Sequence, residues 1–283
     1  MWKNRLLLFF SVIQLTGSIT SLQAQNLSNF NDNWYFTLSD SPEYSLTSYK
    51  PSHWRLLNLP HDWSIEHDFS KDLEECTAFS RGGIGWYSKV FKTPIDENQK
   101  CYIIFDGVYN NAEFWLNGMR IGNHPYGYAP VYYDLTNLLA PKGHENRLSV
   151  RVDHSRYADS RWYTGSGIYR NVQLLMVDKL HIPVWGTFIT TPMVTSDKAS
   201  VAIQIDIQND YDIAQKAELI TDIFDPNGVF VKRIQSSVEM QAAEKQVIKQ
   251  SIEIGNPQLW DVDNPHLYTA KTKIDIEGKV LQQ

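Results

Sequence analysis

Short segments of alternating apolar and polar residues, separated by turn residues, make up most of this chain. Residues 112–116 alternate in this way and are followed by Asn117-Gly118, a dipeptide that is a strong hairpin signal between alternating segments. The same alternation returns at residues 148–152 and 201–207, while no segment shows helical periodicity over a helix-length stretch. The sequence therefore predicts an all-β protein built from antiparallel sheets.

The length and the spacing of these segments predict two domains. A chain of 283 residues has room for about two domains. We assign residues 25–180 to a jelly-roll sandwich, because the distances between successive strands favour that topology over a simple meander. The pattern restarts after Pro183 and Pro192. Residues 181–283 then suit an immunoglobulin-like β-sandwich of about 100 residues, which we expect to lack its end.

Residues 1–24 have the features of a secretory signal peptide. Lys3 and Arg5 form a basic start, residues 6–15 are mostly apolar, and Ala24 is a small residue at the expected cleavage point. The apolar run is too short for a membrane-spanning helix, so we expect no membrane partner. The mature protein is expected to be exported, either to the periplasm or outside the cell.

The composition argues against nucleic acid as a partner and is compatible with sugar binding. The formal charge of −6 becomes −8 when the two basic residues of the leader are removed, and no basic run remains. Aromatic residues make up 13% of the chain, and aromatic faces cover the apolar face of a sugar ring. Cys76 and Cys101 are the only cysteines, and the sequence leaves open whether they are bridged.

The segment from Asp159 to Arg170 is the principal candidate site. It combines turn residues with Arg161, Trp162 and Tyr163, as a ligand-binding loop on a rigid sandwich would. A structural interpretation is also open, in which Trp162 and Tyr169 close the end of the sandwich and the arginines pair with carboxylates. We expect Arg170 itself to be a buried partner of a carboxylate or a backbone carbonyl.

Three further stretches carry polar or aromatic side chains. His61-Asp62 and Glu66-His67-Asp68 match no established zinc spacing, so we expect no metal or other cofactor, with Asp62 capping a turn and Trp63 packed inward. The stretch 125–128 is read either as an aromatic platform for a glycan or as the bend before a strand. Three glycines at 82, 83 and 85 predict a tight turn or bulge with positive φ.

Several phrases, in this order, resemble the amino-terminal half of the family 2 glycoside hydrolases, a group of β-galactosidases, β-glucuronidases and β-mannosidases. The phrases are Leu59-Pro-His-Asp-Trp63, Gly82-Gly-Ile-Gly-Trp-Tyr87, Phe105-Asp-Gly-Val108, Trp115-Leu-Asn-Gly118, Pro125-Tyr-Gly-Tyr128, Tyr133-Asp-Leu-Thr136, Arg161-Trp-Tyr-Thr-Gly-Ser-Gly-Ile-Tyr-Arg170 and Leu259-Trp-Asp-Val-Asp-Asn-Pro-His-Leu-Tyr268. The resemblance is greatest to the β-galactosidase branch.

This resemblance implies a jelly-roll sugar-binding domain, an immunoglobulin-like domain and a catalytic (β/α)₈ barrel. The barrel needs about 250 residues, and only 23 residues follow Trp260, so we expect it to be absent from this chain. The family uses two barrel glutamates for retaining hydrolysis, the first after an Asn, and Asn-Glu occurs nowhere here. The resemblance therefore implies a β-linked carbohydrate substrate, a missing catalytic barrel and no activity for this chain alone.

The resemblance also implies that the loop at 159–163 reaches the sugar. In relatives an acidic residue precedes this motif; the family spacing lands on Arg161, and Asp159 lies two residues earlier. Either Asp159 meets the sugar or Arg161 replaces the acid, with Trp162 and Tyr163 beside them as further sugar contacts. A free-standing carbohydrate-binding protein and a purely structural pair of sandwiches remain alternatives, an oligomer is possible, and the sequence alone does not decide whether the chain is an enzyme.

Overall fold

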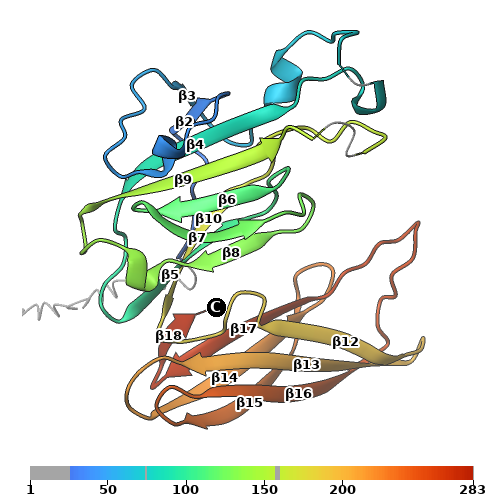
Figure 1. Ribbon diagram of the computed structural model, residues 1–283. Coiled ribbons are helices and arrows are strands. Elements are labelled where there is room, and N and C mark those ends of the chain that lie inside the picture. The colour runs from blue at the N-terminus through green and yellow to red at the C-terminus, as the bar shows by residue number, and fades with distance from the viewer. Residues whose placement is uncertain (1–25, 74, 157–159, 283) are drawn as a thin grey trace, which may run out of the picture.

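The computed structural model describes residues 26–73, 75–156 and 160–282. Their fold is two β-sandwiches placed one beyond the other along the chain (Figure 1). The regular elements are almost all antiparallel strands, as the alternating sequence predicts. Among the described residues, no helix is long and apolar enough to cross a membrane.

The first sandwich packs a four-stranded sheet against a six-stranded sheet. In spatial order the smaller sheet contains β1 (Asn26–Asn29), β10 (Val172–Asp178), β5 (Gln99–Phe105) and β8 (Val131–Asp134). The larger sheet contains β3 (Arg55–Leu57), β2 (Trp34–Thr37), β4 (Gly83–Lys92), β9 (Glu145–His154), β6 (Ala112–Leu116) and β7 (Met119–His124). Strands that are neighbours in a sheet are often distant in sequence, as expected of a jelly roll.

The core of the first sandwich forms between the inward faces of these strands. Phe114 of β6 and Phe105 of β5 are fully buried, with ring centroids 4.8 Å apart. The predicted hairpin follows β6: Asn117 and Gly118 both have positive φ, as the tight turn between two antiparallel strands requires. Cys101 is a free thiol in this core, and its burial raises its pKa to about 12.

Four short 3-10 helices lie in the loops of the first sandwich. They are η1 (Pro42–Ser45), η2 (Trp63–Glu66), η3 (Glu75–Thr77) and η4 (Thr136–Leu138). The loops with η2 and η3, between β3 and β4, lie at one end of the sandwich, beside the chain that links β9 to β10 (Figure 1). Parts of the chain far apart in sequence therefore meet at this end.

The second sandwich has two four-stranded sheets of longer strands. In one sheet β13 (Lys198–Asn209) pairs with β16 (Lys245–Gly255) on one side and with β12 (Thr187–Val194) and β11 (Leu180–His181) on the other. The other sheet is ordered β15 (Phe230–Met240), β14 (Gln215–Phe224), β17 (Thr269–Ile276) and β18 (Lys279–Gln282). A turn at residues 225–228 closes the β14–β15 hairpin, with the Gly228 amide donating to the Asp225 carbonyl.

Direct contacts fasten the two sandwiches to each other. The Lys100 ammonium lies 2.6 Å from a carboxylate oxygen of Asp210, and the Tyr102 hydroxyl lies 3.1 Å from Nε2 of His181. Within the second sandwich, the Gln282 side chain bonds both the amide and the carbonyl of Ile182, which lies just after β11 at this junction. β11 begins two residues after β10 ends, so little free chain separates the two sandwiches.

Candidate functional site

Asp62 holds together the two loops at the end of the first sandwich. As the N-cap of η2, its carboxylate accepts a hydrogen bond from the Ser64 amide at 2.9 Å. It also accepts one from the Ser166 amide at 2.8 Å and one from the Tyr163 hydroxyl. Partial burial and this hydrogen bond to Asp62 raise the pKa of Tyr163. One carboxylate therefore fixes both the short helix and the 160–170 loop.

Buried polar contacts lie beneath the 160–170 loop. The Ser166 hydroxyl is 2.6 Å from the Ser64 hydroxyl and 2.6 Å from Nδ1 of His154, and all three residues are buried. Gly167 exchanges two backbone hydrogen bonds of 2.9 Å with Tyr109. Gly167 has a φ of +121°, and a Cβ there would lie 2.2 Å from the Tyr87 hydroxyl. Only glycine suits this position.

His61 joins this support to the strand below it. Its Nδ1 is 2.7 Å from the Tyr87 hydroxyl, and its Nε2 is 3.1 Å from a carboxylate oxygen of Glu66. Burial lowers the pKa of His61, outweighing the nearby charge of Glu66. Burial alone would raise the pKa of Glu66, but hydrogen bonds and charge from Arg55 and His61 hold it below its usual value. The cluster acts as a rigid base for the loop.

We use the name aromatic rim for four of the exposed aromatic side chains at this end of the sandwich: Tyr126, Tyr128, Trp162 and Tyr163. Their exposed fractions run from 38% for Tyr128 to 61% for Tyr126 and Trp162. The Trp162 indole N–H donates to the Tyr128 hydroxyl at 3.0 Å, and the Tyr126 and Tyr128 rings lie 5.6 Å apart. The Tyr169 hydroxyl donates to the Gly127 carbonyl at 2.9 Å and thereby holds the segment that carries Tyr126 and Tyr128 in place. Such rings can stack on sugar rings.

The structure brings together three of the four residues predicted to bind the sugar. Trp162 and Tyr163 are part of the rim, and Arg161 is exposed immediately before them. The fourth, Asp159, lies outside the described residues. At 61% exposure Trp162 does not close the end of the sandwich, so that structural interpretation is wrong for this residue.

Comparison with known proteins gives matches along the whole described chain. The model of glycosyl hydrolases family 2, sugar binding domain, matches residues 17–178, and the model of glycosyl hydrolases family 2 matches residues 181–283. This chain belongs to glycosyl hydrolases family 2.

Similar family 2 proteins include both β-galactosidases and β-glucuronidases. The β-galactosidase BoGH2A of Bacteroides ovatus is 38% identical over 91% of this chain, and a putative β-glucuronidase of Formosa agariphila is 38% identical over 95%. The chain covers 31% and 25% of these relatives, respectively, so it spans about a third of their length or less.

Solved family 2 structures share the fold of both sandwiches. A family 2 member from Bacteroides cellulosilyticus superposes with a TM-score of 0.83 at 38% identity, covering 90% of this chain and 34% of that one. Bacteroides uniformis β-glucuronidase 2, covalently bound to cyclophellitol-6-carboxylate aziridine, gives a TM-score of 0.82 at 25% identity, covering 92% of this chain and 32% of that one. These comparisons confirm the jelly-roll and immunoglobulin-like fold.

Within this family 2 chain, two expectations about single residues are wrong. Arg170 is exposed, and its guanidinium lies over the Tyr169 ring, 5.5 Å from the centroid, so it is not a buried ion-pair partner. Of the three clustered glycines, only Gly83 has a positive φ. At Gly82 and Gly85 there is no room for a side chain. A Cβ at residue 82 would lie 2.3 Å from the His154 carbonyl oxygen, and a Cβ at residue 85 would lie 2.6 Å from the Trp63 ring.

The acidic side chains at this end of the family 2 chain serve internal contacts. Asp62 caps η2, and Trp63 is fully buried, as predicted. The described residues include no group of three or more His, Cys, Asp or Glu side chains that could hold a metal ion. Every described carboxyl group whose pKa is displaced has it lowered.

Sequence reasoning missed the contact that completes the rim. Tyr128 and Trp162 are 34 positions apart, and nothing local in either segment signals their hydrogen bond. The usable signal was weaker: both segments were rich in aromatic residues beside glycine, and each was open to interpretation as a platform. The support from Asp62 to the loop was also missed, because only its local cap was visible.

Proposed function

We propose that this chain forms the sugar-facing, non-catalytic part of an exported family 2 exo-β-glycosidase and does not hydrolyse glycosides by itself. The observation that carries the proposal is family membership along both sandwiches, in a chain that spans about a third of its relatives or less. The second half rests on the chemistry of the family, because retaining hydrolysis needs one protonated and one charged carboxyl group about 5–5.5 Å apart, and the resemblance places that pair in the barrel.

In this proposal the aromatic rim borders the pocket that receives the terminal sugar. Trp162 and Tyr128 are joined by a hydrogen bond, and Asp62 fastens Tyr163 from behind. Aromatic side chains held in this way lose little conformational freedom on binding, which favours them as sugar platforms. The pocket itself is completed by the catalytic barrel that the rest of such an enzyme supplies.

For the terminal sugar, we propose a β-galactoside first and a β-glucuronide second. The β-galactosidase from Bacteroides ovatus supports the first. The putative β-glucuronidase at equal identity and the exposed Arg161 on the rim support the second, since a guanidinium pairs well with a carboxylate. The basic and apolar character of residues 1–24 supports export through a signal peptide.

The test uses this chain together with a family 2 barrel, either fused in one polypeptide or supplied in trans. Turnover of nitrophenyl β-galactoside and β-glucuronide identifies the sugar. Trp162→Ala is expected to raise KM by about tenfold, the loss of roughly one stacking contact. Trp260→Ala, an equally exposed tryptophan of the second sandwich, is the control. Equal KM values for the two variants would contradict a sugar-facing rim.

The same assay shows whether Arg161 contributes to a preference for β-glucuronide over β-galactoside. If a glucuronide is the substrate and Arg161 meets its carboxylate, Arg161→Gln is expected to reduce kcat/KM for the glucuronide by about tenfold or more while sparing the galactoside. If Arg161→Gln leaves the ratio of the two kcat/KM values unchanged, Arg161 does not determine which sugar is preferred. Affinity of the 283-residue chain alone for millimolar galactosides that is lost in Trp162→Ala would favour the alternative of a free-standing carbohydrate-binding protein.

A further inference from the structure

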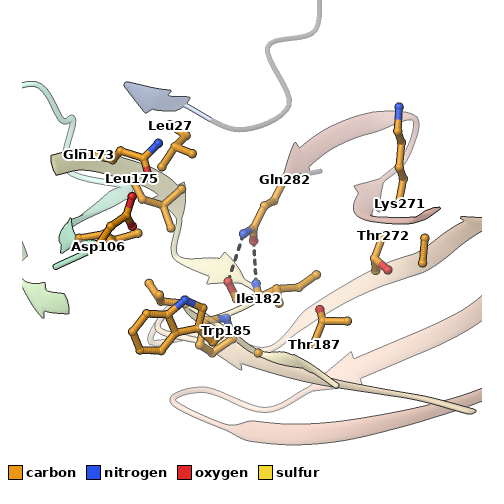
Figure 2. Close-up of a pocket in the computed structure, with 15 residues that line it drawn as sticks. Leu27, Asp106, Gln173, Leu175, Ile182, Trp185, Thr187, Lys271, Thr272 and Gln282 are labelled. Atoms are coloured by element: carbon orange, nitrogen blue, oxygen red, sulfur yellow. Dashed lines mark hydrogen bonds between the residues drawn. The ribbon is translucent and has the colours of Figure 1, made fainter. Parts of the chain in front are cut away.

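A cleft of about 850 Å³ lies between the two sandwiches. That size is within the range of small-ligand sites. Figure 2 shows Asp106 and Gln173 on the side of the first sandwich, Thr187 and Thr272 on the side of the second, and Trp185 between them. None of the lining residues belongs to the aromatic rim. The cleft is therefore a separate feature of the molecule.

Trp185 is presented to this cleft by a rigid turn. The Gly186 amide donates to the Pro183 carbonyl at 2.9 Å and closes the turn, and the Asp206 amide donates to the Gly186 carbonyl at 2.7 Å. The Gln282 side chain bonds both backbone groups of Ile182, which precedes the turn (Figure 2). Hydrogen bonds therefore hold both ends of the turn to the second sandwich.

The backbone of Trp185 is unusual for so bulky a residue. Its φ is +59°, in the left-handed region that most L-residues avoid because their Cβ comes too close to the following carbonyl oxygen. Core packing does not explain the choice, because the side chain is 60% exposed. Its ring stands edge-to-face against the Tyr132 ring at 5.1 Å, which leaves much of the indole surface open. Strained, exposed aromatic residues of this kind are candidates for ligand contact.

The polar groups that line the cleft together with Trp185 suit the hydroxyl groups of a sugar. The Asp106 carboxylate accepts hydrogen bonds, the Gln173 amide both donates and accepts, and the Thr187 and Thr272 hydroxyls do either. An indole face with such groups on two sides matches a pyranose, which has an apolar face and hydroxyl edges. We propose that this cleft is a second carbohydrate-binding site, with Trp185 as its stacking platform for a short oligosaccharide.

This site goes beyond the proposed function, which concerns the rim; only the choice of galactosides as probes rests on that function. The test titrates the 283-residue chain with lactose and a β-linked galactotriose by calorimetry, and follows the tryptophan indole N–H signals by NMR. The signal that disappears in Trp185→Gly identifies Trp185. Glycine accepts the positive φ, so this variant is expected to fold with its turn intact.

We expect the galactotriose to shift the Trp185 signal and Trp185→Gly to weaken binding by at least about tenfold. Asp106→Asn is expected to weaken it by a smaller factor, and Trp260→Ala, at an exposed tryptophan outside both the cleft and the rim, to change it by less than about twofold. A Trp185 signal that does not move at millimolar sugar overturns the site. So does binding that survives Trp185→Gly or is lost in Trp162→Ala.

The two proposals fail in different ways. Loss of binding in Trp162→Ala alone removes the cleft site and leaves the rim of the proposed function supported. A Trp185 signal that responds to sugar, in a chain that gives no glycosidase activity even with a barrel, retains the cleft site and removes the proposed function. Lactose compared with galactotriose then shows whether the cleft prefers the longer sugar.

Discussion

The two sandwiches of this chain are both built from antiparallel strands, but they differ in strand regularity and in how their loops are supported. In the second, long strands alternate regularly between buried and exposed residues, as β13 does from Lys198 to Asn209. In the first, strands are generally shorter, and the loops at one end rest on buried polar side chains such as His61, His154 and Ser166. The first sandwich thus combines a hydrophobic core with a fixed hydrogen-bond network, and the second relies mainly on its core.

This difference affects how precisely the loops of the first sandwich are positioned. A buried polar group is costly unless it is hydrogen-bonded, so a network of such groups permits few alternative arrangements. The network beneath the 160–170 loop therefore gives the exposed Trp162 and Tyr163 a defined position. In the second sandwich the buried Asn209 has a similar role on a smaller scale, because its side-chain amide donates to the carbonyls of Ile213 and Gln241 in two loops.

The largest difference in lost unfolding free energy between the two sandwiches is expected when one glycine in each is replaced by alanine. Gly167→Ala forces a positive φ on alanine and places its Cβ against the Tyr87 hydroxyl, which should cost about 3 kcal/mol or more of unfolding free energy. Gly228→Ala also has a positive φ, but nothing lies within 4 Å of its Cβ, so about 1 kcal/mol is expected. Urea unfolding measures both. Equal losses would mean that the 160–170 loop is not tightly supported.

A smaller difference is expected from one aspartate in each sandwich. Asp62→Ala removes the acceptor of two backbone amides and the Tyr163 hydroxyl, at a cost of about 1–3 kcal/mol. Asp225→Ala removes the acceptor of two amides in an exposed turn, at about 0.5–1 kcal/mol. Thermal unfolding gives the ranking. Only Asp62→Ala should also weaken sugar binding at the rim, and a variant that binds as before would show that Tyr163 needs no support.

The polar network should also make stability depend on pH. Burial lowers the pKa of His61 in the folded state, so the unfolded chain binds its proton more readily below about pH 6.5. Stability should therefore fall as the pH drops from about 6.5 toward the lower folded pKa, by about 1.4 kcal/mol per unit of pKa difference. His181, at the junction, has its pKa lowered by burial as well and acts in the same direction.

Variants separate these contributions. His61→Gln should flatten the slope of unfolding free energy against pH between 5 and 7, and His181→Gln should flatten the remainder. Glu66 acts at lower pH: its lowered pKa adds stability that is present above about pH 4.5 and lost as the pH falls through the folded value. His266→Gln, on the loop between β16 and β17, controls for the substitution. A slope that is unchanged in His61→Gln would contradict a buried neutral imidazole.

The smallest effect on stability is expected from the exposed tryptophans. Trp162→Ala and Trp260→Ala remove side chains of 61% and 58% exposure, and each should change the unfolding free energy by about 0.5 kcal/mol or less. Their effects on sugar binding should differ, because only Trp162 belongs to the rim. A large loss of stability in Trp162→Ala would instead make this residue part of the packing.

Local patterns predicted the strands well, and contacts between distant segments escaped prediction. Alternation at 201–207 and Asn117-Gly118 each specify a local backbone geometry, and both are found as expected. The pairing of Tyr128 with Trp162 depends on how β8 and β9 bring their loops together, which no local pattern encodes. Gly85 was misread for the same reason, since the ring that excludes a side chain belongs to Trp63, 22 positions earlier.

The sequence therefore located the candidate site along the chain but predicted only some of the contacts within it. Its aromatic residues were visible from their types and their glycine neighbours. Their support was not, because Asp62 acts on the 160–170 loop through space. Arg170 shows the limit most plainly: its type suggested a buried ion pair, and only the fold shows that it covers the outer face of Tyr169.

Whether the two sandwiches lack catalytic activity is decided by hydrolysis of nitrophenyl β-galactoside and β-glucuronide by the purified 283-residue chain, with and without a family 2 barrel. We predict no turnover above background by the chain alone, and turnover with the barrel that depends on Trp162. Hydrolysis by the chain alone would contradict the central claim, because it would require an acid and a nucleophile within these two sandwiches.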